Sequence, residues 1–161
     1  MARAAPFVVL ALLFTLAGCA GGSAPSQLSG LWSAGPAACA AGVGVRFDAD
    51  AIRAVYDNES EILFANPRYA LESDGEMFRV RIVYDLPQVA GGARVVGSHG
   101  VLVLARQRGE GGIAPVAHSM VDGRTGAARM RLVGDPAIGL MTLEPCGAHP
   151  WGAPLRGRYR S

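Results

Sequence analysis

The segment MFRVRIVYDL, residues 77–86, has the clearest strand pattern in the chain. Its apolar residues recur at every second position: Phe78, Val80, Ile82, Tyr84 and Leu86. Three of the four intervening positions carry charge, with Arg79, Arg81 and Asp85 on the opposite face. A period of two predicts a half-buried antiparallel strand with one solvated face.

The same alternation recurs at residues 43–48 and 128–133, and further short apolar runs lie between clusters of turn residues. Residues 61–64 and 68–72 are expected to form two strands, separated by the breaker Asn66-Pro67. Residues 101–104, VLVL, predict a central strand that is covered on both faces. Many short strands without a helical stripe predict an all-β fold, either a small antiparallel β-barrel or a sandwich.

The N-terminus reads as an export signal. One positive charge, Arg3, precedes an apolar run over residues 7–17, which is shorter than the roughly 20 residues of a membrane-spanning helix. The end of this run, Leu16-Ala17-Gly18-Cys19, resembles the lipobox of bacterial lipoproteins. The resemblance implies cleavage before Cys19, a diacylglycerol thioether on Cys19 and acylation of the new N-terminus. The alternative is an ordinary secreted protein in which Cys19 forms a disulfide.

The lipobox resemblance divides the chain into a signal peptide (residues 1–18), a flexible tether (19–28) and a single β domain (29–161). The residue after the cysteine is Ala20 and not an acid, which in such lipoproteins favours the outer membrane. We therefore expect a lipid-anchored domain that faces the periplasm of a bacterial cell envelope, with the membrane as its first partner.

Two cysteines remain in the β domain once Cys19 is assigned to the anchor. In an oxidising compartment an even pair predicts a disulfide, here between Cys39 and Cys146. Two buried free thiols are the alternative. A zinc site is disfavoured because neither cysteine has a second Cys or His at ligand spacing, apart from His149 three residues after Cys146.

The charge of the chain excludes some partners. The chain has no lysine, and its 15 basic residues nearly balance 13 acidic ones. Nucleic-acid binding needs a concentrated positive surface, so we expect no nucleic-acid partner. The arginines of the predicted strands are expected on solvated outer faces, partly paired with acids of neighbouring strands. Contact with anionic lipid is the alternative for these faces.

A short pattern at each end of the domain bears on its architecture. Gly30 and Trp32 form a Gly-x-Trp near its start, and Arg156 and Arg158 lie near its end. This arrangement weakly resembles lipocalin-like (calycin) barrels, in which an arginine of the last strand stacks over a tryptophan of the first. The resemblance implies a Trp32–Arg156 or Trp32–Arg158 stack that closes the barrel. A buried tryptophan in any β core is the alternative.

Catalytic and metal sites have little support in the sequence. Ser98, His99, His118, Ser119 and Asp122 supply the residue types of a hydrolase triad, but the chain has no G-x-S-x-G elbow. The three histidines lack metal-ligand spacing, and residues 48–61 resemble a calcium loop less than a hairpin. We expect no catalytic residue, no metal and no cofactor.

The segment EPCGAHPWGAP, residues 144–154, concentrates Pro, Gly, His149 and Trp151 around Cys146. A rigid loop with an aromatic side chain predicts a recognition surface at His149 and Trp151. The alternative is that Trp151 plugs the end of the core.

We expect a non-enzymatic role in the periplasm: binding of a small apolar or amphipathic ligand, or of another envelope component, such as an envelope protein. One alternative is a periplasmic protease inhibitor, because small periplasmic barrels with a Gly-x-Trp start and one disulfide resemble bacterial metalloprotease inhibitors. The other alternative is an envelope hydrolase that uses His99 or His118.

Overall fold

The computed structural model describes residues 22–57, 59–86, 97–107, 111–131, 142–148 and 150–151, except for the side chains of residues 129–131. Nine strands in these ranges form one antiparallel sheet in the order β8-β7-β6-β5-β4-β3-β2-β1-β9. Their bounds are β1 Leu31–Ser33, β2 Gly44–Phe47, β3 Ala51–Tyr56, β4 Glu59–Ser73, β5 Arg79–Asp85, β6 His99–Arg106, β7 Ile113–Val121, β8 Ala128–Arg131 and β9 Glu144–Pro145. The all-β prediction is therefore confirmed.

Three short helical turns accompany the sheet: η1 (Ser26–Leu28), α1 (Pro36–Ala40) and η2 (Gly75–Met77). Pro36 begins α1, where its missing N–H costs no helical hydrogen bond. Within the described ranges no helix is both long enough and apolar enough to cross a membrane.

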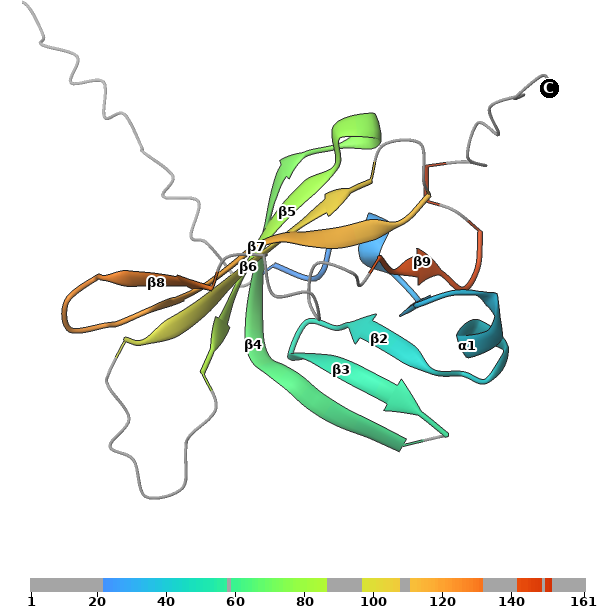
Figure 1. The fold of residues 1–161 in the computed structure, drawn as a ribbon, viewed down its shortest axis with the longest axis horizontal. Coiled ribbons are helices and arrows are strands. Elements are labelled where there is room, and N and C mark those ends of the chain that lie inside the picture. The colour runs from blue at the N-terminus through green and yellow to red at the C-terminus, as the bar shows by residue number, and fades with distance from the viewer. Residues whose placement is uncertain are drawn as a thin grey trace, which may run out of the picture.

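The long strand β4 divides the sheet into two halves, with β2 and β3 on one side and β5 to β8 on the other (Figure 1). Its first part pairs with β3, its second part pairs with β5, and the register shifts between Ala65 and Arg68. The prediction of two strands here was wrong. Asn66 adopts a left-handed φ of 49°, which bends the strand without ending it.

The side chain and backbone of Asn66 explain why the strand continues through the bend. Its N–H donates to Asp50 O at 2.9 Å, and its amide donates to Asp85 Oδ2 at 2.8 Å. The backbone group that leaves the ladder at the bend is therefore satisfied by the β2–β3 turn. Asn is one of the few residues other than Gly that tolerate this conformation.

Alternation in β5 follows the sequence prediction. Val80, Ile82 and Tyr84 are buried, whereas Arg79 and Arg81 are exposed and both pair with Glu72 of β4. This arginine face is therefore paired as expected. The two guanidinium groups, Arg81 first, lower the pKa of the Glu72 carboxyl.

The centre of β6 is covered on both faces, as its continuous apolar run predicts. Leu102, Val103 and Leu104 are consecutive and all buried. Because successive side chains of a strand point to opposite faces, burial of all three requires cover on both sides.

The core gathers at one end of the folded sheet, around the fully buried Trp32. The Trp32 indole N–H donates to Leu28 O at 3.2 Å, and Leu28 of η1 is itself completely buried. Ala24 also packs against this cluster. Residues 24–28 are thus part of the domain, and the expected tether of residues 19–28 is shorter because Leu28 fills the core.

A closed barrel is not established, because the two edge strands β8 and β9 do not pair with each other in the described residues. One isolated bridge brings the two sides of the sheet together. Ile113 at the start of β7 and Leu143 just before β9 exchange two backbone hydrogen bonds of 2.8 Å. The sheet therefore curls far enough for its two sides to touch at this point.

The structure contains the expected disulfide between Cys39 of α1 and Cys146 after β9. Their Cα atoms lie 5.3 Å apart, within the range of about 4.4–6.8 Å that disulfides require. The bond joins residues 107 positions apart in sequence and fixes the segment after β9 to the start of the domain. Cys146 N also donates to Leu31 O at 2.8 Å.

Replacing both Cys39 and Cys146 with Ser should lower the free energy of unfolding by about 4–5 kcal/mol, because the crosslink restricts a loop of this length in the unfolded chain. Urea unfolding of the wild type and the double variant, followed by circular dichroism, measures the difference. Equal midpoints and slopes for the two proteins would show that the crosslink does not contribute to stability.

Candidate functional site

The described residues form a hollow beside Trp151. It has a volume of about 440 Å³, within the range of about 300–1,000 Å³ typical of small-molecule sites. Its lining comes from η1, η2, the end of β6 and the segment after β9: Gln27, Asp74, Gly75, Glu76, Arg106, Pro150 and Trp151. These residues come from four parts of the sequence.

Trp151 forms the aromatic side of this hollow. Its ring packs against Trp32, with centroids 5.9 Å apart, and against Phe78, with centroids 5.1 Å apart. The side chain is only half-buried. Trp151 therefore packs on the core and also lines the hollow.

Arg106, the last residue of β6, lies over the Trp151 ring. Its Cζ atom is 4.9 Å from the ring centroid, which is cation–π distance. Nη1 makes a long hydrogen bond of 3.5 Å to Gly75 O, and no carboxylate of the described residues pairs with this guanidinium. Among the described residues, Gly75 O is the one hydrogen-bond acceptor that this guanidinium meets.

Two carboxylates of the η2 turn complete the rim. Asp74 caps the turn by accepting from Gly75 N at 2.6 Å, and it also accepts from Gln27 Nε2 at 2.8 Å. Glu76 is exposed and makes no hydrogen bond or ion pair with the described residues. The rim thus combines the Arg106 guanidinium with two carboxylates. Asp74 is hydrogen-bonded, whereas Glu76 has no partner among the described residues.

The Trp151 indole N–H has no hydrogen-bond partner in the described part of the chain, although the Nε1 atom is buried. An unsatisfied buried donor costs about 1–3 kcal/mol. Such groups are rare in folded proteins.

Four residues singled out from the sequence lie outside the described residues: Cys19, His149, Arg156 and Arg158. The expected stack of Arg156 or Arg158 on Trp32 is thus not described. The stack that the structure shows joins Arg106 of β6 to Trp151. Sequence reasoning missed Arg106 because nothing in the local pattern marks it as different from the other strand arginines.

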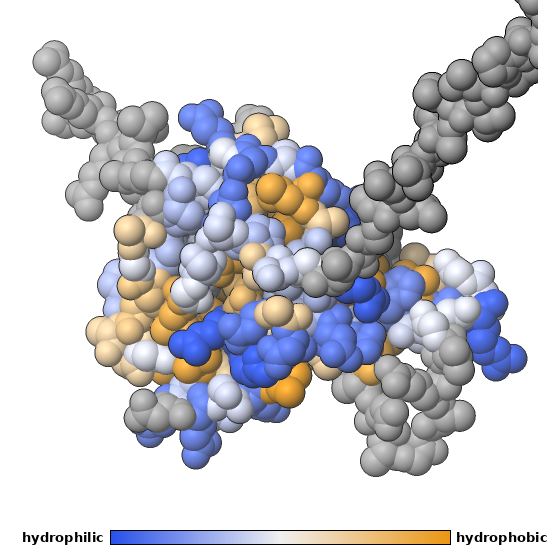
Figure 2. Space-filling view, turned by 180° about the vertical axis from the view of Figure 1, so that it is seen from behind, coloured by the Kyte–Doolittle hydropathy of each residue, from blue (hydrophilic) through white to orange (hydrophobic). Residues whose placement is uncertain are grey.

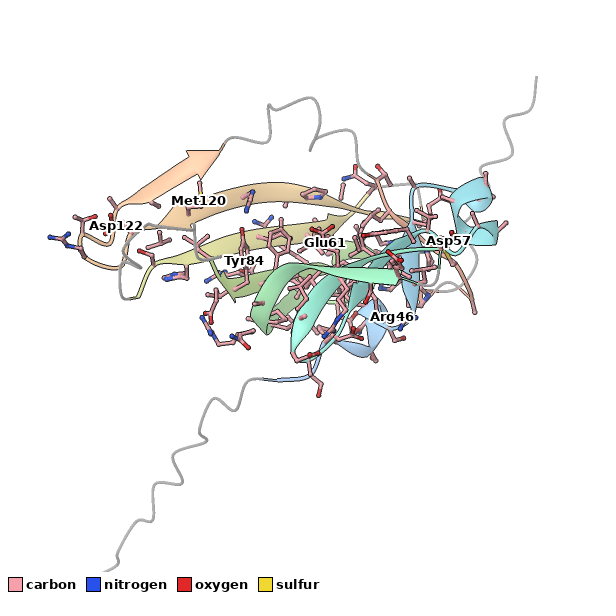
Figure 3. The ribbon with its side chains drawn as sticks, turned by 90° about the horizontal axis from the view of Figure 1, so that it is seen from below. Arg46, Asp57, Glu61, Tyr84, Met120 and Asp122 are labelled. Carbon is pink, nitrogen blue, oxygen red and sulfur yellow. A yellow bond between two sulfur atoms is a disulfide. The ribbon has the colours of Figure 1, made fainter. Side chains whose placement is uncertain are left out.

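A second cluster lies on the inner face of the sheet, between the layer of β2–β4 and the layer of β6–β8 (Figure 3). The Tyr84 hydroxyl and His118 Nε2 share a hydrogen bond of 2.5 Å. The centroids of the Phe64 and Tyr84 rings lie 4.1 Å apart. Burial raises the pKa of the Tyr84 hydroxyl. The pairing of Tyr84 with Gly100 explains the geometry, because a Cβ at Gly100 would lie only 2.0 Å from the Tyr84 ring.

The residues that could have formed a hydrolase triad lie on different faces of the sheet and in turns. Leu102 pairs with His118, whereas His99 shares the opposite face with Val101. Ser98 Oγ accepts from Gly123 N, and Asp122 Oδ1 accepts from the backbone N–H groups of residues 124 and 125. Ser98 and Asp122 therefore stabilise turns.

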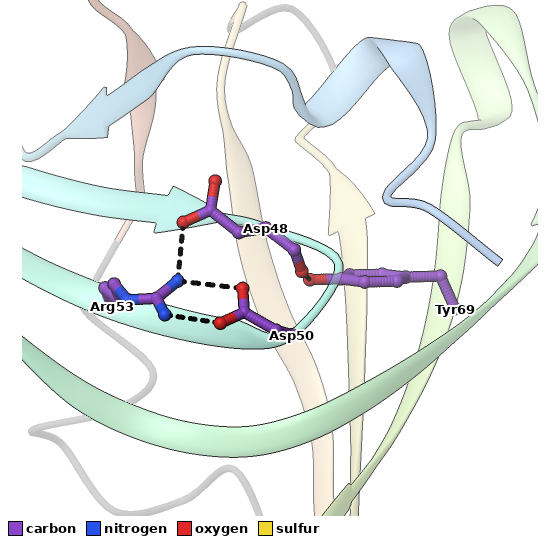
Figure 4. Close-up of polar contacts among 4 residues, drawn as sticks. All are labelled: Asp48, Asp50, Arg53 and Tyr69. Carbon is purple, nitrogen blue, oxygen red and sulfur yellow. Dashed lines mark hydrogen bonds and ion pairs between the residues drawn. The ribbon is translucent and has the colours of Figure 1, made fainter. Parts of the chain in front are cut away.

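The acidic segment at residues 48–50 is a hairpin turn, as the sequence analysis favoured (Figure 4). Arg53 binds Asp48 Oδ2 at 2.9 Å and Asp50 Oδ2 at 2.6 Å. The hydrogen bond from Arg53 lowers the pKa of Asp50, and burial together with the two carboxylates raises the pKa of Tyr69, whose hydroxyl donates to Asp48 O. Within the described residues no three metal-binding side chains gather.

Exposed apolar residues do not define a second site. The most exposed are Met77 and Ile62, at 65% and 58%. Seen from behind, the hydrophobic surface is interrupted by hydrophilic residues (Figure 2). The hollow at Trp151 is therefore the candidate binding site.

The comparisons with known proteins add no assignment. No family model matches the chain. No curated protein and no solved structure matches it. The functional argument therefore rests on the residues of the chain itself.

Replacing Gly100 with Ala should destabilise the protein by about 1–3 kcal/mol, because the new methyl group would displace the Tyr84 ring. Urea unfolding measures the loss, and the NMR signal of the His118 ring should shift because its contact with Tyr84 changes. Gly147→Ala is the matched control, since a Cβ at Gly147 meets no atom within 4 Å. Equal stability of the Gly100 and Gly147 variants would contradict the packing described here.

Proposed function

We propose that this protein is a lipid-anchored component of a bacterial cell envelope that binds a small amphipathic ligand, or a group of another envelope component, without catalysing a reaction. The observation that carries this proposal is the hollow of about 440 Å³ above the half-buried Trp151. A guanidinium over an aromatic ring, together with a carboxylate that has no ion pair among the described residues, is the mixed lining that orients small ligands.

The disulfide supports this role for Trp151. It holds the chain at Cys146, five residues before Trp151, against α1. A recognition residue that is already positioned loses less conformational freedom when a ligand binds. The Trp151 indole N–H, which meets no acceptor among the described residues, also argues that stability alone does not explain this residue.

The lipobox resemblance at Leu16–Cys19 supports the anchor, and Ala20 supports the outer membrane as its place. In this proposal the domain faces the periplasm. The sheet acts as a calycin-like barrel that is closed at the Trp32 end, a view supported by the Ile113–Leu143 bridge.

The protease-inhibitor alternative has one observation in its favour. The core around Trp32 is filled by side chains, and residues 22–28 form an ordered N-terminal arm. An inhibitor of this kind would present its arm to a protease. Here Ala24 and Leu28 pack against the core of the domain itself, which favours the binding role.

The anchor predicts a diacylated and N-acylated Cys19 in the mature protein. Mass spectrometry of the N-terminal peptide detects these groups, and Cys19→Ala should abolish both the acylation and the partition into the detergent phase. An unmodified mature N-terminal peptide in the wild type would contradict the anchor.

Binding at the hollow predicts that the Trp151 indole NMR signal shifts when the mature protein is titrated with an envelope fraction, either polar lipid or soluble cell-wall glycan. Trp151→Phe keeps an aromatic packing partner for Trp32 and Phe78 but removes the indole signal, so its binding is measured by calorimetry beside the wild type and should be several-fold weaker. Tyr56→Phe, an exposed aromatic outside the hollow, is the matched control and should bind like the wild type. No shift at Trp151 with either fraction would contradict the binding role.

A further inference from the structure

The hollow lies at the end of the domain where the chain enters from Cys19. Ala24 packs against the core, so only five residues of chain separate it from Cys19. A fully extended chain of that length spans at most about 18 Å. A lipid on Cys19, which is part of the proposed function, therefore keeps Ala24 within about 18 Å of the acyl chains.

Gln27 links the segment that follows Cys19 to the rim of the hollow. It lies three residues after Ala24 in η1, and its side chain donates to Asp74 on the rim. The lipid headgroup layer is about 5–8 Å thick on each side of the hydrocarbon. The rim of the hollow can therefore reach the headgroups of the leaflet that holds the anchor.

The charges of the rim select among headgroups. Arg106 holds its guanidinium over the Trp151 ring at the rim of the hollow, and a guanidinium can bind a phosphate through two hydrogen bonds. Glu76 offers a carboxylate that no described residue pairs with in the same hollow, and Asp74 adds a second negative charge. Two carboxylates against one guanidinium disfavour a purely anionic group and favour one that also carries an ammonium.

We propose that the hollow binds the zwitterionic phosphoethanolamine headgroup of the membrane in which the protein is anchored, with the phosphate on Arg106 and the ammonium on Glu76. This inference rests on the proposed function and names its ligand. Binding would dock the domain against the bilayer, with the Trp151 hollow toward the headgroups.

The experiment titrates the mature protein, held in a non-ionic detergent, with glycerophosphoethanolamine while the Trp151 indole signal is followed by NMR. Inorganic phosphate, ethanolamine and glycerophosphocholine serve as separate probes. We expect saturable binding of glycerophosphoethanolamine and weaker binding of the other three, because each lacks one charge or the N–H donors of the ammonium.

Two variants test separately how the phosphate and the ammonium of the headgroup are bound. Arg106→Lys should weaken binding of glycerophosphoethanolamine about 10- to 100-fold, the effect of losing hydrogen bonds to a charged group. Glu76→Gln should remove the preference for glycerophosphoethanolamine over inorganic phosphate. Arg124→Lys and Glu59→Gln are the matched controls on exposed residues outside the hollow, and both should bind like the wild type.

Bilayer nanodiscs test the membrane as the source of the headgroup. In discs of phosphatidylethanolamine the anchored protein should show the same Trp151 shift, and in discs of phosphatidylcholine it should not. Equal binding of inorganic phosphate and glycerophosphoethanolamine by the wild type would overturn the headgroup assignment. A Trp151 shift with cell-wall glycan alone would also overturn it, while leaving the proposed binding function intact.

Discussion

The crosslink between Cys39 and Cys146 is the constraint on which the candidate site depends. It ties the segment after β9 to α1 and so places Trp151 over Trp32 and Phe78. Strand β9 has only two residues, and among the described residues it pairs with β1 alone, so backbone hydrogen bonds there hold it weakly. Without the disulfide, the position of Trp151 at the hollow would depend on the backbone contacts of β9 and on the packing of its own ring.

The bend in β4 is the second constraint. A single strand of 15 residues contributes to both halves of the sheet, and the bend at Asn66 turns one half toward the other. This geometry gathers the core at one end, where η1, η2 and Trp151 cover it. The hollow is therefore a product of the same folding of the sheet that buries Trp32.

Sequence reasoning predicted the strand class and the disulfide because both depend on local or countable features. Alternation over residues 77–86 identifies the buried face of β5, and two cysteines in a domain that we expect to be exported leave one pairing. The continuity of β4 was missed because Pro67 normally signals a break, whereas its missing N–H is tolerated beside the bulge.

The candidate site was predicted only in part. Trp151 stands out in a loop rich in Pro and Gly, but Arg106, Glu76 and Gln27 join it only through the fold. The Tyr84–His118 contact was also missed, since it depends on Gly100 lying beneath the Tyr84 ring. Contacts between residues distant in sequence leave no local pattern in a single chain.

The central claim is that the crosslink positions Trp151 over the core and thereby forms the hollow. Hydrogen exchange of the two indole N–H groups, measured by NMR with and without the Cys39–Cys146 bond, tests it most directly. The account predicts that both indoles are protected in the crosslinked protein. Without the bond Trp151 should lose its protection, while Trp32, which donates to Leu28 O, should keep it. Unchanged protection of Trp151 in the protein without the bond would contradict the account.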